Sequence, residues 1–194
     1  MQGGFFMQYN FQLLSKELIS RLFLDLGITD FCTAAQFVRN LDYKRNFRKE
    51  DVLCVLKEKG RTCSSKHSLL KLLATENKRV EVKLILGIFK MNSNNTPKIV
   101  KVLEKYNLKE IPEAHNYLKI NNQIHDYTRR NSKPEYFLND LLEEIEIEPS
   151  QITTFKIEYH QIFIGNYLKE NPKIPYSAEE FWQIREECIS ALQN

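Results

Sequence analysis

The sequence predicts an α+β protein in which helices pack against an antiparallel sheet. Much of the chain carries apolar residues at helical spacing. One run, VEVKLILGIF at 80–89, is rich in β-branched residues and alternates at its start, which predicts a strand buried on both faces. Two alternating runs, HNYLKI (115–120) and QIHDYT (123–128), are separated by Asn121-Asn122, and asparagine tolerates positive φ, so we predict a tight hairpin.

Three helices are predicted in the N-terminal part of the chain. The first is SKELISRLFLDLGI, from Ser15, with a serine to cap it and a glycine to end it. The second begins at Thr29 or Asp30 and includes FCTAAQFV, and the third covers EDVLCVLKEK (50–59). Cys54 lies inside the apolar part of this third helix, so we interpret it as a packing residue.

A fourth predicted helix follows Gly60 and runs to about Asn77. Its apolar face is wide and comprises Leu69, Leu70, Leu72, Leu73 and Ala74. Its first turn carries Cys63, preceded and followed by small hydroxyl residues that are placed to cap the helix: Thr62, Ser64 and Ser65. The sequence therefore predicts a central helix with a thiol at its N-terminus.

Further helices are predicted after the strand and after the hairpin. Asn95-Thr96-Pro97 opens one that KIVKVLEKY fills, because proline is well tolerated in a first turn. Three more are predicted at about 134–146, 151–170 and 178–192. Ser177 and Glu180 form a capping box at the start of the last one. His160 is expected on the surface of its helix.

Composition narrows the classes of partner. The 28 basic and 25 acidic residues are interspersed and give a net charge of +3, so no strong field favours nucleic acid or an anionic membrane. The longest apolar run, LILGIF at 84–89, is far shorter than the roughly 20 residues of a membrane helix. The first residues lack the basic region and cleavage site of a signal peptide, so we expect a cytoplasmic protein. We also expect no cofactor.

The cysteines do not follow a metal or disulfide pattern. Cys32, Cys54, Cys63 and Cys188 show no CxxC spacing, which argues against a zinc finger and a disulfide framework. We expect reduced thiols. A thiol at a helix N-terminus faces unpaired N–H groups and the positive end of the helix dipole, and both favour the nucleophilic thiolate. Cys63 is therefore the candidate nucleophile.

The predicted hairpin ranks the histidines that could serve as its base. A two-residue turn at Asn121-Asn122 puts His115 and Asp126 on one face as diagonal neighbours, with Cα atoms about 7–8 Å apart. His125 then points to the other face. His67 is on the same side of its helix as Cys63 but has no evident carboxylate to orient it, so it ranks second. We expect Lys66 and His67 to be structural or solvent-facing.

These motifs resemble the transglutaminase-like (papain-like) superfamily, in particular its small bacterial transglutaminase-like proteins. GRTCSSKHSLLKLLA, LILGIFKMN, IPEAHNYLKI and HDYT supply, in order, a cysteine opening a helix, a histidine opening a strand and an aspartate on the next strand. The resemblance covers about 40–130. It implies a Cys63–His115–Asp126 triad, with Cys63 as nucleophile, His115 as base and then acid, and Asp126 orienting the imidazole.

The resemblance also implies the domain organisation and the chemistry. We expect a single domain over 1–194, in which a papain-like core at about 40–130 carries helical parts at 1–39 and 131–194. The implied reaction is cysteine-dependent acyl transfer or amide hydrolysis through a thioester, on an amide, peptide or thioester substrate, with hydrolysis slightly favoured.

Two features depart from the larger members of this superfamily. They use an aromatic residue upstream of the cysteine to help stabilise the oxyanion, whereas the one tryptophan here, Trp182, lies far downstream. Tyr43 is a substitute candidate, with the Cys63 backbone N–H as the other donor. The calcium-binding loops and extra β domains of animal transglutaminases are missing, so protein crosslinking is not implied.

Two alternatives remain open. Cys63, His67, His115 and Asp126 could surround a zinc ion, and His67 discriminates because a metal site needs it and a triad does not. The other alternative is a non-catalytic interaction protein that kept the fold.

Overall fold

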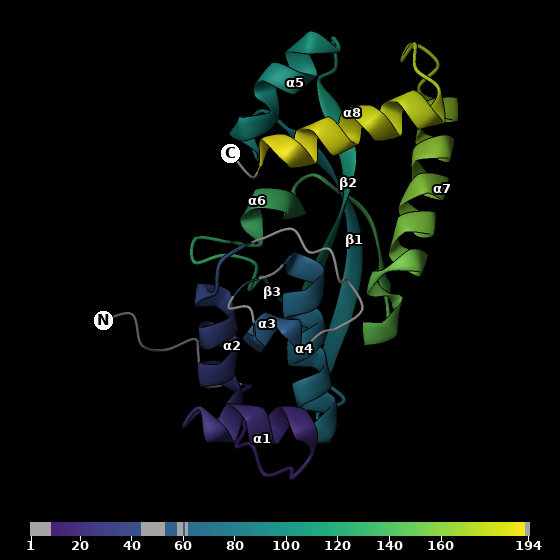
Figure 1. The fold of residues 1–194 in the computed structure, drawn as a ribbon. Helices are drawn as coiled ribbons and strands as arrows, with labels where there is room; N and C mark the ends of the chain where they lie inside the picture. The colour runs from purple at the N-terminus through teal and green to yellow at the C-terminus, as the bar shows by residue number, and fades with distance from the viewer. Residues whose placement is uncertain (1–8, 44–52, 58–59, 61, 193–194) are drawn as a thin grey trace. The chain divides into compact units, whose positions relative to one another are not determined.

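The computed structural model describes residues 9–43, 53–57, 60 and 62–192 (Figure 1). Four helices precede the sheet: α1 (Leu18–Asp25), α2 (Phe31–Asn40), α3 (Cys54–Lys57) and α4 (Cys63–Glu76). The strands are β1 (Val82–Asn92), β2 (Glu110–Ile120), β3 (Gln123–His125) and β4 (Leu141–Glu146). The other helical elements are η1 (Pro97–Ile99), α5 (Val100–Lys105), α6 (Glu135–Leu138), η2 (Pro149–Ile152), α7 (Thr154–Glu170) and α8 (Ala178–Ala191).

The four strands form one antiparallel sheet in the order β3-β2-β1-β4. This confirms the α+β class. β1 is buried on both faces over most of its length, as its β-branched sequence predicts.

The chain divides into two compact units that alternate along the sequence. The first contains the described residues up to Leu86, Asn116–Pro134 and Ile145–Ile152. The second contains Gly87–His115, Glu135–Glu144 and the residues from Thr153 onward. In the first unit, α1 and α2 both contact α4 (Figure 1). Leu69, Leu70 and Leu73 of α4 are fully buried, which confirms α4 as a central helix. In the second unit, α8 contacts α5 and α7.

The β2–β3 hairpin has the predicted two-residue turn. Asn121 and Asn122 both adopt positive φ, 49° and 64°, as a turn that matches the twist of an antiparallel pair requires. The register pairs Leu118 with His125, Lys119 with Ile124 and Ile120 with Gln123. The predicted facing of Lys119 and Ile124 is therefore confirmed.

The helix predicted at 134–146 is wrong. Only Glu135–Leu138 is helical, and the chain then forms β4, which was missed in the sequence. The segment LLEEIE is charged enough to suggest a solvated helix, but β1 gives it a strand edge to pair with: the Ile147 N–H donates to the Leu84 carbonyl oxygen and the Lys90 N–H to the Asp140 carbonyl oxygen. Pairing with a neighbouring strand overrides a local preference that a glutamate-rich segment has for helix.

The remaining helix predictions mostly hold. α7 and α8 match the predicted 151–170 and 178–192 closely, and the capping box at Ser177 and Glu180 is formed. Cys54–Lys57 is helical, while residues 50–52 and 58–59 of the predicted third helix lie outside the described residues. Within the described part of the chain, no helix has both the length and the apolar character needed to cross a membrane.

Candidate active site at the start of α4

Cys63 is the first residue of α4 and belongs to the first unit. It is buried, with 7% of its surface exposed. The first turn of a helix leaves its N–H groups without intrahelical acceptors, so the thiol lies beside donors and the positive end of the helix dipole. The predicted capping is not formed at Thr62, the N-cap residue, which makes no side-chain cap hydrogen bond.

The segment that leads into Cys63 is fixed against the end of α2. Asp42 and Gly60 form an isolated parallel bridge. A Cβ atom at Gly60 would lie 2.8 Å from the Asp42 carbonyl oxygen, which is closer than real Cβ contacts, so a side chain at this position would force the two segments apart. Gly60 therefore places α4 with its first turn close to the residues after α2.

Ser64 connects the first turn of α4 to β2. Its hydroxyl donates to Asn116 Oδ1 at 2.8 Å, and Asn116 Nδ2 donates to the Ile85 carbonyl oxygen at 3.0 Å. The Cys63 sulfur lies 4.0 Å from Ser64 Oγ, a weak contact at most. Since Ser64 uses its proton toward Asn116, its role is to connect the elements rather than to cap the helix.

Lys66 lies one turn after the cysteine and is fully buried. Its ammonium donates to the carbonyl oxygens of Leu41, at 2.5 Å, and Thr128, at 2.9 Å. Burial lowers the pKa of Lys66 to about 8, against the attraction of Asp42, Cys63 and Asp126. The structural role predicted for Lys66 is confirmed, and the side chain does not face solvent.

His67 is fully buried and bonded through both ring nitrogens. Nδ1 lies 2.8 Å from the Cys63 carbonyl oxygen, which can only accept, so Nδ1 carries the proton. Nε2 accepts the Tyr127 N–H at 2.8 Å. This pair of bonds defines a neutral imidazole that joins α4 to the residues after β3, and it supports the structural interpretation of His67.

Asp126 lies directly after β3 and is nearly buried. Its Oδ1 accepts from the Thr128 N–H at 2.9 Å and from the Thr128 hydroxyl. The same oxygen lies 3.6 Å from His67 Nε2. The sequence-based statement that His67 has no carboxylate nearby is therefore wrong: folding of the hairpin brings Asp126 to it.

His125 belongs to a different cluster. Its ring lies against Tyr9, at 4.5 Å between centroids, and stacks with Tyr127 at 6.1 Å. Burial lowers the pKa of His125 to about 4, and its buried Nε2 has no hydrogen-bond partner among the described residues. A neutral histidine packed among tyrosines fits the prediction that His125 does not serve the triad.

The other two predicted site residues lie as follows. His115 is in β2 and belongs to the second unit, where its ring contacts Phe137 at 5.0 Å and Phe89 at 6.2 Å between centroids. Tyr43 belongs to the first unit and lies under the Arg129 guanidinium, 4.2 Å from its ring centroid. The approach of the Cys63 sulfur to a His115 ring nitrogen, which the triad requires, stays a prediction.

Two of the remaining cysteines, Cys188 and Cys32, have surroundings that disfavour a thiolate. Burial raises the pKa of Cys188 to about 12. Burial and the neighbouring Asp30 raise the pKa of Cys32. Cys54 is buried, as its apolar sequence predicts. The four cysteines all lie in the described residues and are not joined in disulfides.

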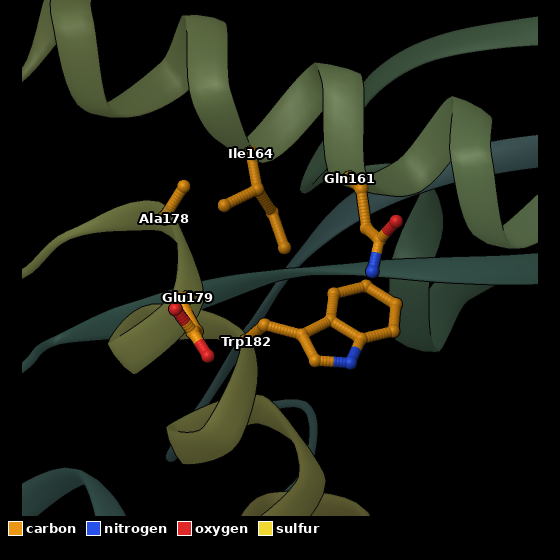
Figure 2. A pocket seen from close by; sticks show the side chains of 5 residues that line it. All are labelled: Gln161, Ile164, Ala178, Glu179 and Trp182. Atoms are coloured by element: carbon orange, nitrogen blue, oxygen red, sulfur yellow. The ribbon is translucent and has the colours of Figure 1, made fainter.

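A cavity between α7 and α8 in the second unit has a volume of about 200 Å³ (Figure 2). Gln161 and Ile164 project from α7 toward Trp182 of α8. Beside it, His160 is buried and its Nε2 lies 3.0 Å from the Pro112 carbonyl oxygen. The expectation that His160 is a surface residue is therefore wrong, because α8 covers the face of α7 that carries it. The described lining of the cavity consists of Gln161, Ile164, Ala178, Glu179 and Trp182.

No group of three or more histidine, cysteine, aspartate or glutamate side chains in the described residues is arranged to hold a metal ion. A zinc ion binds one ring nitrogen of a histidine, and both nitrogens of His67 are instead hydrogen-bonded to backbone groups.

The full burial of Lys66 and the hydrogen bonds of Asn116 were missed in the sequence. The signal for Lys66 was present: residues 63, 66, 67, 70, 73 and 74 share one helix face, so the spacing places its side chain with Leu70 and Leu73 on the buried side. Asn116 carried a weaker signal, an amide inside a run that is otherwise buried.

Comparison of the chain with models of known families, with curated proteins and with solved structures found no match.

Proposed function

We propose that the protein is a transglutaminase-like cysteine enzyme that hydrolyses an amide, peptide or thioester bond, or transfers its acyl group, with Cys63, His115 and Asp126 as the triad. The observation that carries this proposal is the position of Asp126. The Asp126 carboxylate, which follows the two-residue turn and β3, is nearly buried against α4, with Oδ1 3.6 Å from Nε2 of His67, four residues after Cys63.

The hairpin register supports the pairing of His115 with Asp126. Extending the observed register by one residue sets Tyr117 opposite Asp126. His115 precedes Tyr117 by two positions in β2, so alternation gives the two side chains the same face of the strand. The proposal therefore sets Asp126 diagonal to His115, the relation in which an imidazole and a carboxylate on neighbouring strands can meet.

The proposed reaction begins with the thiolate. The Cys63 sulfur attacks the carbonyl carbon of the substrate, and the carbon–oxygen π electrons move onto the oxygen. When the tetrahedral intermediate collapses, the leaving amine takes a proton from the His115 imidazolium and a thioester remains on Cys63. His115 then removes a proton from water, or from an amine acceptor, which attacks the thioester carbonyl and restores the thiolate.

Asp126 and the helix terminus support opposite charges in this cycle. The carboxylate orients the His115 ring and stabilises the imidazolium, and we assign that role to its second oxygen, Oδ2. The oxyanion forms at the carbonyl of the substrate, where the first-turn N–H of Cys63 is the proposed donor. Tyr43 is proposed as the other donor, with the Arg129 guanidinium fixing its ring.

The test compares two neighbouring residues. Asp126→Asn removes the charge while keeping size, so hydrolysis of chromogenic ester and anilide substrates is expected to fall by about 10²- to 10⁴-fold. His125→Phe is the matched control, since it keeps the aromatic packing against Tyr9 and Tyr127; its activity is expected to stay near wild type. Melting temperature monitors folding in both variants. Strong loss in His125→Phe with none in Asp126→Asn would contradict the triad and its register together.

A further inference from the structure

We propose that Lys66 is a positioning residue of this site, which fastens the Asp126 segment to the first turn of α4 and whose positive charge favours the thiolate of Cys63. This inference rests on the proposed function of Cys63. It concerns a side chain that the acyl-transfer steps do not use.

The fastening follows from a short chain of hydrogen bonds. Lys66 Nζ donates to the Thr128 carbonyl oxygen, and the N–H and hydroxyl of Thr128 donate to Asp126 Oδ1. One residue away, His67 accepts the Tyr127 N–H. Two consecutive side chains of α4 thus hold three consecutive residues, 126–128, and the carboxylate cannot move independently of the helix that carries Cys63.

The second bond of Lys66 reaches the other side of the site. Its ammonium also donates to the Leu41 carbonyl oxygen, next to Asp42, which bridges to Gly60. The end of α2, the approach to α4 and the segment after β3 therefore meet around one buried nitrogen. The acceptors of these two hydrogen bonds are neutral carbonyl oxygens, which do not cancel the charge of the ammonium. The charge can therefore act on anions nearby.

Charged and titratable groups of the described residues act on this ammonium from several elements. Asp42, Cys63 and Asp126 attract it, and Arg129 repels it. With a pKa of about 8, Lys66 remains about nine-tenths protonated at pH 7. The interaction is reciprocal: if a Cys63 thiolate favours the charged Lys66, the charged Lys66 favours the Cys63 thiolate by the same free energy.

The experiment measures the alkylation rate of Cys63 by iodoacetamide from pH 5 to 9, with peptide mass spectrometry to separate the four cysteines. In Lys66→Met the pH midpoint is expected to rise by about one unit, which makes alkylation about tenfold slower below the midpoint. Lys71→Met is the matched control: this lysine lies five residues after Lys66 on α4 and donates to the Val82 carbonyl oxygen, and its replacement is expected to leave the profile unchanged.

The outcomes separate this inference from the proposed function. A wild-type midpoint near the ordinary 8.5 of a thiol would contradict an activated Cys63 and so the proposed function. A low wild-type midpoint that Lys66→Met leaves unchanged would overturn the role of Lys66 alone. Equal shifts in Lys66→Met and Lys71→Met would also overturn it, because they would show a nonspecific charge effect.

A second measurement does not depend on the folding of Lys66→Met. Lysine side chains labelled with ¹³C report the titration of Lys66 by NMR in the wild type and in Cys63→Ala. Reciprocity predicts that the Lys66 midpoint falls when the thiolate is removed. An unchanged midpoint would overturn the inference.

Discussion

Two described cations, the buried Lys66 of the first unit and the largely buried Arg185 of the second, have different kinds of partner. Lys66 in the first unit donates to the backbone carbonyl oxygens of Leu41 and Thr128. Arg185 in the second unit donates through Nε and Nη2 to the two oxygens of Glu113, at 2.6 Å each, and through Nη1 to Glu186. Arg185 and Glu113 form a planar, bidentate ion pair, whereas the Lys66 ammonium is hydrogen-bonded only to neutral backbone carbonyl groups at these two bonds.

The electrostatic consequences of burial differ accordingly. Burial alone would raise the pKa of Glu113, but the charge and hydrogen bonds of Arg185 outweigh it and hold that pKa below its ordinary value. Burial dominates at Lys66 and lowers its pKa to about 8. The charges of Arg185 and Glu113 compensate each other, and this pair serves the structure of the second unit. Lys66 retains a charge that can act on a neighbouring anion, as the chemistry proposed for Cys63 requires.

Breaking the ion pair is expected to have the largest effect on stability. Arg185→Met leaves the Glu113 carboxylate buried without its cation, so the free energy of unfolding is expected to fall by about 3–5 kcal/mol in urea denaturation. The double variant Glu113→Gln/Arg185→Met should recover much of this loss, because it removes both charges.

Lys105→Met controls for the loss of a cation in the same unit. Lys105 pairs with Glu187 at the surface, and exposed pairs contribute little, so only a small change is expected. If Arg185→Met were as mild as Lys105→Met, the buried pair would not be the structural element that its geometry indicates.

A smaller effect is expected from the titration of Lys66. Its pKa is about 8 in the folded protein and 10.5 ordinarily, so between these values the unfolded chain binds more protons at this site than the folded protein. Stability contributed by this site therefore rises by up to about 3 kcal/mol as pH rises from about 8 to 10.5, and this gain is lost when pH falls back from 10.5 to 8, below which the site has no further effect.

Urea denaturation at pH 8 and 10.5 checks this dependence. The rise contributed by Lys66 is expected to disappear in Lys66→Met and to persist in Lys71→Met, so comparison among the three proteins removes the titration of other groups. Identical pH dependence in wild type and Lys66→Met would show that the lysine is not buried as a charge in the folded protein.

The sequence predicts local features of this protein well because short-range chemistry determines them. Asn121-Asn122 fixes the hairpin turn through positive φ, and Ser177 with Glu180 fixes the start of α8. The start of α4 near Cys63 could likewise be predicted from the helical spacing of the apolar residues that follow it. The candidate nucleophile and the register of the hairpin that carries Asp126 follow from these features alone.

Long-range pairings were not accessible in the same way. The formation of β4 depends on an available strand edge at β1, and the burial of His160 depends on α8 packing over α7. The contacts of Asp126 with α4 likewise require the hairpin and the helix to meet. Lys66 shows the intermediate case: its helix position predicts burial, but its carbonyl partners come from residues 25 positions before it and 62 positions after it.

The most direct test of the central claim is detection of the acyl intermediate on Cys63. The protein is mixed with p-nitrophenyl acetate at pH 7, quenched in acid during turnover and after substrate exhaustion, and mapped by peptide mass spectrometry. The account predicts one acetyl group on Cys63 during turnover, removable by hydroxylamine as a thioester, lost once substrate is consumed and absent in Cys63→Ala. Acetylation spread over several cysteines, or confined to lysines and resistant to hydroxylamine, would contradict it.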